Sequence, residues 1–125
     1  MKNIIISVDK HRLKAQLNDC ETAEKIHNAL PIEGTVKTWG DEIYFDIPVE
    51  ITQAKDAVAD VEVGTLGYWP VGSAFCIFFG KTPVSTGDKP RAASPVNIFG
   101  VVMGDPTILK SVEAGARITV SKAQE

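Results

Sequence analysis

The densest group of residues able to do chemistry is a short acidic stretch that holds Asp41, Glu42 and Asp46. It lies in a segment predicted to be a strand, whose side chains alternate between two faces, so Glu42 and Asp46 share a face with Tyr44. Two carboxylates on one face can act as an acid and a base. The more common interpretation is a solvated strand face, because acid–base work needs a burial that a sequence does not show.

Other catalytic and metal-binding patterns are incomplete. The chain has only two histidines, His11 and His27, and neither lies at metal-ligand spacing from a cysteine or a carboxylate. We therefore expect no metal site and no catalytic triad built on a histidine base. The segment 80–82 ends like a phosphate-binding loop, but Phe75 stands where such a loop needs its first glycine, so we also expect no cofactor.

Composition restricts the class of protein. Thirteen basic and sixteen acidic side chains are interspersed and give a formal net charge of -3, which argues against a nucleic-acid partner. The 125 residues suit a single domain over 1–125, and 44% hydrophobic with 23% charged residues is typical of a globular fold. This balance predicts a fold that needs neither a metal nor a disulfide to be stable.

The expected location is the cytoplasm. The apolar run at residues 4–6 ends at Asp9, which makes it too short for a signal peptide or a membrane span, so no membrane partner is expected. The two cysteines, Cys20 and Cys76, differ in setting and are interpreted as reduced thiols.

Alternating and β-branched patterns predict about eight strands along the chain. The expected strands cover 4–8, 13–17, 35–39, 42–47, then 61–63 and 66–69 interrupted by bends or bulges at Gly64 and Gly67, and 74–79, 96–103 and 116–121. A helix is expected over 21–30, capped near Asp19 and stopped by Pro31, and a second short helix over 107–112. These elements predict a mainly β fold, a closed and mostly antiparallel barrel, because closure removes exposed strand edges.

The most apolar segment, 74–79, should have both faces covered. Its odd and even positions point to opposite sides: Phe75, Ile77 and Phe79 to one, and Ala74, Cys76 and Phe78 to the other. One row would fill the barrel, and the other would face whatever covers it. The segment that follows, 81–95, is rich in turn formers and is expected to be a functional or mobile loop.

The second half of the chain resembles the cyclophilins in the order and spacing of its motifs. The matching segments are 72–77 (GSAFCI), 81–82 (KT), 96–102 (VNIFGVV), Gly115 and 117–120 (RITV). Nearly the whole chain is similar to a group of prokaryotic proteins of unknown function with a cyclophilin-like barrel, through segments 38–45, 67–70 and 78–85. The resemblance implies an eight-stranded cyclophilin-like barrel with two short helices and an outer groove.

The resemblance also places the residues on which cyclophilin activity depends. In that family an arginine is held to stabilise the twisted amide, helped by a glutamine and an apolar wall. Here the glutamine position is Ala74, the next groove phenylalanine is Cys76, and the histidine before the later strand is Val96. No arginine occurs in the corresponding segment 45–48. The resemblance therefore implies a groove without the usual prolyl isomerase residues.

Three hypotheses of function follow. The first is a domain that binds a peptide or small molecule in a groove formed by Tyr44, Trp69, Ala74, Cys76, Phe78 and Val96, with the 81–95 loop as a lid. The alternative is a divergent peptidyl-prolyl cis-trans isomerase in which Arg91 or another loop cation supplies the missing donor. The third is a hydrolase or lyase that uses Glu42, Asp46 and Lys81.

Overall fold

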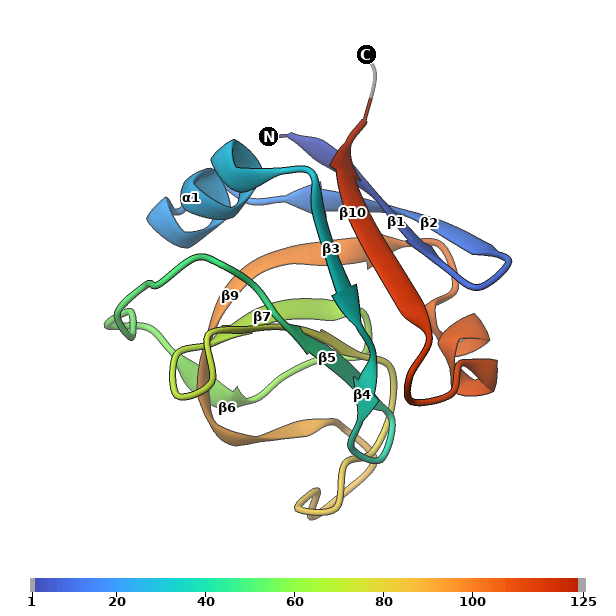
Figure 1. The fold of residues 1–125 in the computed structure, drawn as a ribbon. Coiled ribbons are helices and arrows are strands. Elements are labelled where there is room, and N and C mark those ends of the chain that lie inside the picture. Colours follow the sequence, from blue (N-terminus) through green and yellow to red (C-terminus); the bar gives the residue numbers. More distant parts are fainter. Residues whose placement is uncertain (1, 124–125) are drawn as a thin grey trace.

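The computed structural model describes residues 2–123, and within them the chain is mainly β, as predicted (Figure 1). The strands are β1 (Asn3–Val8), β2 (His11–Leu17), β3 (Ile32–Thr35), β4 (Lys37–Thr38), β5 (Glu42–Asp46), β6 (Val58–Asp60), β7 (Thr65–Trp69), β8 (Ala74–Phe78), β9 (Arg91–Met103) and β10 (Arg117–Lys122). The helices are α1 (Glu21–Ala29) and the 3-10 helix η1 (Pro106–Ser111).

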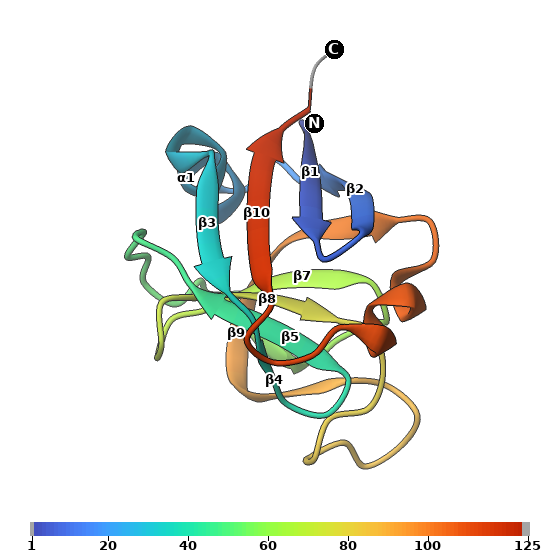
Figure 2. The ribbon, with the colours of Figure 1, turned by 45° about the vertical axis from the view of Figure 1, so that its right-hand side comes forward.

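The strands pair antiparallel in the order β3-β10-β1-β2-β9-β7-β8-β5-β4, and β6 pairs with β9 beside this path. In Figure 2, β3, β10 and β1 stand nearly upright, whereas β5, β7 and β8 run across them. The sheet thus turns through a steep angle and encloses the core between its two parts.

The predicted closed barrel of eight strands is wrong in both respects. The described residues form ten strands, and the hydrogen-bonded path has two ends, at β3 and β4. The segment predicted as one strand over 35–39 divides at Val36, whose backbone N–H donates to Ala116 O and whose carbonyl accepts from Gly115 N. The part before Val36 therefore pairs with β10, and the part after it pairs with β5.

Strand β9 begins earlier than predicted. Residues 91–95, expected as the end of a loop, belong to it because β6 pairs with this stretch, from Val58 opposite Val96 to Asp60 opposite Arg91. The register shifts between these two pairs, and such an irregularity accommodates Pro95 inside a strand. The strand segment predicted over 61–63 is wrong, since β6 lies at 58–60, whereas the segment predicted over 66–69 is confirmed within β7.

Both short helices form where they were predicted. The amino end of α1 is capped near Asp19, as predicted, by the next residue, Cys20, whose thiol accepts a hydrogen bond from the Ala23 backbone N–H at 3.4 Å. The second helix is a 3-10 helix, and the carboxylate of Asp105 caps it by accepting from the Thr107 N–H at 3.0 Å.

Strand β8 separates two hydrophobic clusters, as its alternation predicted. The inner cluster contains Phe75, Ile77 and Phe79, and there the Phe75 ring stacks on Phe45 at 5.1 Å and meets Phe99 edge-on at 5.0 Å. The outer cluster consists of Val61, Ala74, Cys76, Phe78, Ala92 and Val96, with Tyr44 and Trp69 packed against it. The inner cluster fixes the strands, and the outer cluster provides the floor of a site.

Gly67 allows β7 and β9 to pack closely under the outer cluster, at the register shift between these strands. A Cβ at this position would lie 2.8 Å from Val96 Cγ2 and 3.3 Å from Phe78 Cε2. We expect Gly67→Ala to lower the free energy of unfolding by about 1–3 kcal/mol through overpacking, as measured by urea denaturation. The matched control is Gly87→Ala, where no heavy atom lies within 4 Å and little change is expected. Equal effects of the two substitutions would contradict this packing.

Candidate functional site

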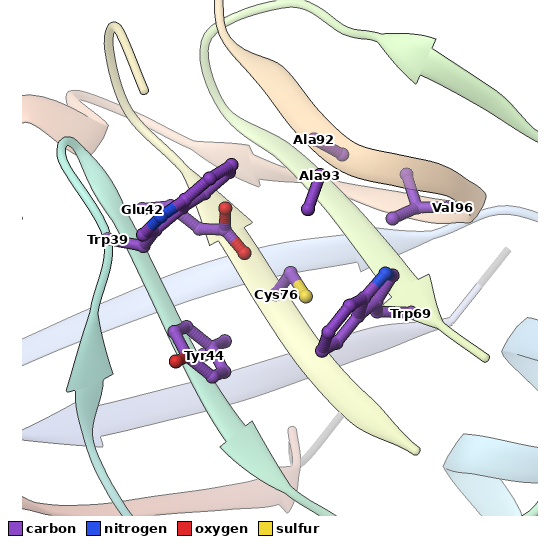
Figure 3. Close-up of a pocket in the computed structure, with 8 residues that line it drawn as sticks. All are labelled: Trp39, Glu42, Tyr44, Trp69, Cys76, Ala92, Ala93 and Val96. Carbon is purple, nitrogen blue, oxygen red and sulfur yellow. The ribbon is translucent and has the colours of Figure 1, made fainter. Parts of the chain in front are cut away.

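A pocket of about 200 Å³ opens on the outer cluster (Figure 3). The lining residues are Trp39, Glu42, Tyr44, Trp69, Cys76, Ala92, Ala93 and Val96. They come from β5, β7, β8 and β9 and from the turn that joins β4 to β5. The pocket therefore combines residues far apart in the sequence, and the pairing of these strands positions them.

Three aromatic side chains, those of Trp39, Tyr44 and Trp69, form the walls. Figure 3 shows the two tryptophans on opposite sides, with Glu42 and Cys76 between them. The Trp69 indole N–H donates to Ser94 Oγ at 2.6 Å, which holds this ring against β9. On the other side the turn is fixed by a hydrogen bond from the Trp39 backbone N–H to Glu42 O at 3.0 Å. The Trp69 ring is thus held by a side chain of β9, and the backbone that carries Trp39 is fixed by the turn.

Glu42 brings a carboxyl group into this apolar setting. The residue is only 6% exposed, and within residues 2–123 no lysine, arginine or histidine forms an ion pair with it. Burial raises the pKa of Glu42 to about 7, and a hydrogen bond from the Cys76 thiol partly opposes this rise. At neutral pH the carboxyl group is therefore close to half protonated.

Cys76 lies across the strand pair from Tyr44 and is thus a diagonal neighbour of Glu42. Burial raises the pKa of the Cys76 thiol well above its ordinary value, and the charge of Glu42 and the hydrogen bond to its carboxylate raise it further, whereas a backbone hydrogen bond at Trp69 lowers it. The thiol stays protonated at neutral pH. Since the thiolate is the reactive form, Cys76 is not suited to nucleophilic catalysis.

The structure places four of the six predicted groove residues on the pocket surface, namely Tyr44, Trp69, Cys76 and Val96. The other two, Ala74 and Phe78, lie beneath the surface in the outer cluster. Sequence reasoning missed Trp39, Ala92 and Ala93. The aromatic residue before the turn at Gly40 was a signal that could have indicated Trp39, whereas the two alanines were hidden by the assignment of 81–95 to a loop.

The three residues proposed for acid–base chemistry do not lie together in one site. Glu42 is buried, but Asp46 on the same face is exposed and pairs with Lys37 at 3.3 Å. Lys81 lies 3.9 Å from Asp88 and does not line the pocket. The three residues proposed for a hydrolase or lyase therefore have separate partners.

Arg91, the candidate donor of the isomerase alternative, does not line the pocket either. Its Nε lies 3.8 Å from Asp60 Oδ1, on the strand that pairs beside it. Of the segment predicted as a lid, only Ala92 and Ala93 reach the pocket, and both belong to β9. The lining thus contains one carboxyl group and no basic side chain.

Residues 2–123 show no sign of a metal centre, a membrane-spanning helix or a disulfide. These residues contain no group of three or more His, Cys, Asp or Glu side chains placed to hold a metal ion. None of the helices in this range has the length and apolar character needed to cross a membrane. Cys20 and Cys76 are both free thiols.

The raised pKa of Glu42 has a consequence for stability. The folded protein holds this proton up to about pH 7, whereas the unfolded chain releases it near its ordinary value of 4.5. The stabilisation from this bound proton is therefore complete below pH 4.5, and it is lost as the pH rises to about 7. A shift of this size corresponds to roughly 3 kcal/mol, and Glu42→Gln should not show this loss.

Urea denaturation of the wild type and of Glu42→Gln, at about pH 5 and about pH 8, measures this difference. We expect the variant to gain stability relative to the wild type at the higher pH. Asp46→Asn is the matched control, because that carboxylate belongs to the same strand face but is exposed. A stability difference between Glu42→Gln and wild type that does not change with pH would exclude a buried, uncompensated Glu42.

Comparison with known proteins assigns the fold family. The family described as Cyclophilin-like matches residues 2–121. The solution structure of a hypothetical protein from Archaeoglobus fulgidus is similar with a TM-score of 0.82 and 37% sequence identity, and the match covers 98% of this chain and 95% of that chain. A search of curated proteins gave no match. The resemblance predicted from the sequence is thus confirmed, and the chain belongs to the cyclophilin-like family.

Proposed function

We propose that the domain binds a small molecule, or one side chain of a peptide, in the pocket between Trp39 and Trp69. The observation that carries the proposal is a pocket of about 200 Å³ with aromatic walls and a single carboxyl group. Ligand sites are typically concave and mostly apolar, with a few polar groups that orient the ligand. The aromatic rings offer a large contact area at a low cost in conformational entropy.

A preformed pocket strengthens the case for binding. The Ser94 hydroxyl already holds Trp69, and a Cβ at Gly72 would lie 2.8 Å from the Trp69 ring, so the backbone packs closely against this ring. Because the Trp69 ring is already ordered, a ligand need not order it on binding, and this saves conformational entropy at that wall.

Prolyl isomerisation is the less favoured function. The uncatalysed barrier is ~20 kcal/mol, and lowering it requires a preorganised donor directed at the amide. No arginine, glutamine or histidine lines the pocket, and Arg91 pairs with Asp60 instead. These observations support a binding domain without the usual isomerase residues.

The two tryptophans of the chain, Trp39 and Trp69, both line the pocket, so intrinsic fluorescence reports directly on its occupancy. A fragment library of amines, acids and neutral compounds should contain ligands that change this fluorescence in a saturable manner. Ala93→Phe should weaken their binding at least about tenfold, because the new ring occupies an exposed edge of the pocket.

The matched control is Ala114→Phe, which adds the same ring at an exposed turn after η1 and should leave affinity unchanged. An exchange-based NMR assay with proline peptides serves as the counter-test. Absence of any saturable ligand would refute the binding function, and efficient isomerisation would favour the alternative.

A further inference from the structure

The charges around the pocket are unevenly compensated. Asp41, the neighbour of Glu42 in sequence, lies 3.9 Å from the Nζ of Lys110, and Asp46 pairs with Lys37. Glu42 is the most buried of these three acidic residues, yet it has no cation partner among residues 2–123. The other titratable groups in the pocket lining are the Tyr44 phenol on β5 and the Cys76 thiol on β8. Nothing in the lining supplies a positive charge.

The aromatic walls of the pocket also favour a positively charged ligand. The face of an aromatic ring is electron-rich and attracts cations, and the attraction grows when water is excluded. The Tyr44 ring already receives such a contact from outside the pocket lining, since the Nζ of Lys37 lies 5.8 Å from its centroid. Trp39 and Trp69 present the ring type that binds cations best.

An anionic ligand would face both the carboxyl group and these ring faces. A neutral apolar ligand would leave the Glu42 carboxylate without compensation, so the group would have to keep its proton. A cation instead supplies the missing partner and, at the same time, occupies the aromatic walls.

We propose that the pocket selects an organic cation, an ammonium or guanidinium group that lies between Trp39, Tyr44 and Trp69 and pairs with Glu42. This inference rests on the proposed ligand-binding function and narrows its ligand class. The cation belongs either to a free small molecule or to a lysine or arginine side chain of a peptide, and both sources offer the same recognised group.

A matched pair of probes isolates the charge: choline and its neutral isostere 3,3-dimethylbutanol have almost the same shape. Affinity for each is measured by tryptophan fluorescence and by calorimetry. We expect choline to bind at least about tenfold more tightly than the alcohol at about pH 8. Glu42→Gln should remove this preference with little effect on the alcohol, and Asp46→Asn should preserve it.

The pH dependence gives a second readout. Since a cation binds the deprotonated form of Glu42, whose pKa is about 7, choline affinity should rise about tenfold between about pH 6 and about pH 8. The alcohol should show no such rise, and neither should choline with Glu42→Gln. Circular dichroism of the variant verifies its fold.

Two further pairs of probes distinguish the sources of the cation. Butylammonium and butylguanidinium represent free cations, and acetyl-lysine amide and acetyl-arginine amide represent peptide side chains. Equal or tighter binding of the amides supports a peptide ligand, and their exclusion supports a free small cation. The cation inference would be overturned if choline and both alkyl cations bound no better than neutral or acidic fragments, and the proposed binding function would then still stand. If no fragment bound at all, both the cation inference and the binding function would be overturned.

Discussion

The chemistry of this pocket depends on one carboxyl group that is held away from water without a cation beside it. Burying a charged carboxylate is costly unless it is paired, and Glu42 has no such pair within the described residues. The protein therefore retains a proton there up to about pH 7, and it protects a neighbouring thiol from ionisation. Burial is the largest cause of both effects, and the charge of Glu42 adds to the second.

The two faces of β8 have different roles, and this difference allows the fold to bury Glu42. The inner cluster, with the stacked rings of Phe45 and Phe75, fixes the register of β5 and β8 and so places Glu42 diagonally opposite Cys76. The outer cluster contains small side chains at the pocket, and Ala92 and Ala93 on β9 leave the space open. The larger cluster thus lies on one side of the strand, and the pocket opens on the other.

Local patterns predicted the mainly β class, the short helices and the two faces of β8, because each depends on side chains a few residues apart. The number of strands, the open sheet and the early start of β9 were not predictable in this way, since they depend on pairing between distant segments. The same limit applies to the site. Alternation showed that Glu42 and Asp46 share a face, but not that Glu42 would be buried in a pocket lined by Trp39 and Trp69 while Asp46 stays exposed.

Family membership defines the framework, and on it the pocket lining combines one carboxyl group with three aromatic rings. The most direct test is a carbon-13 NMR titration of the Glu42 side-chain carboxyl, assigned by its loss in Glu42→Gln. A midpoint near 7 is the predicted result. A midpoint near the ordinary value of 4.5 would mean that the group is solvated or already paired, and would contradict the buried, uncompensated carboxyl group.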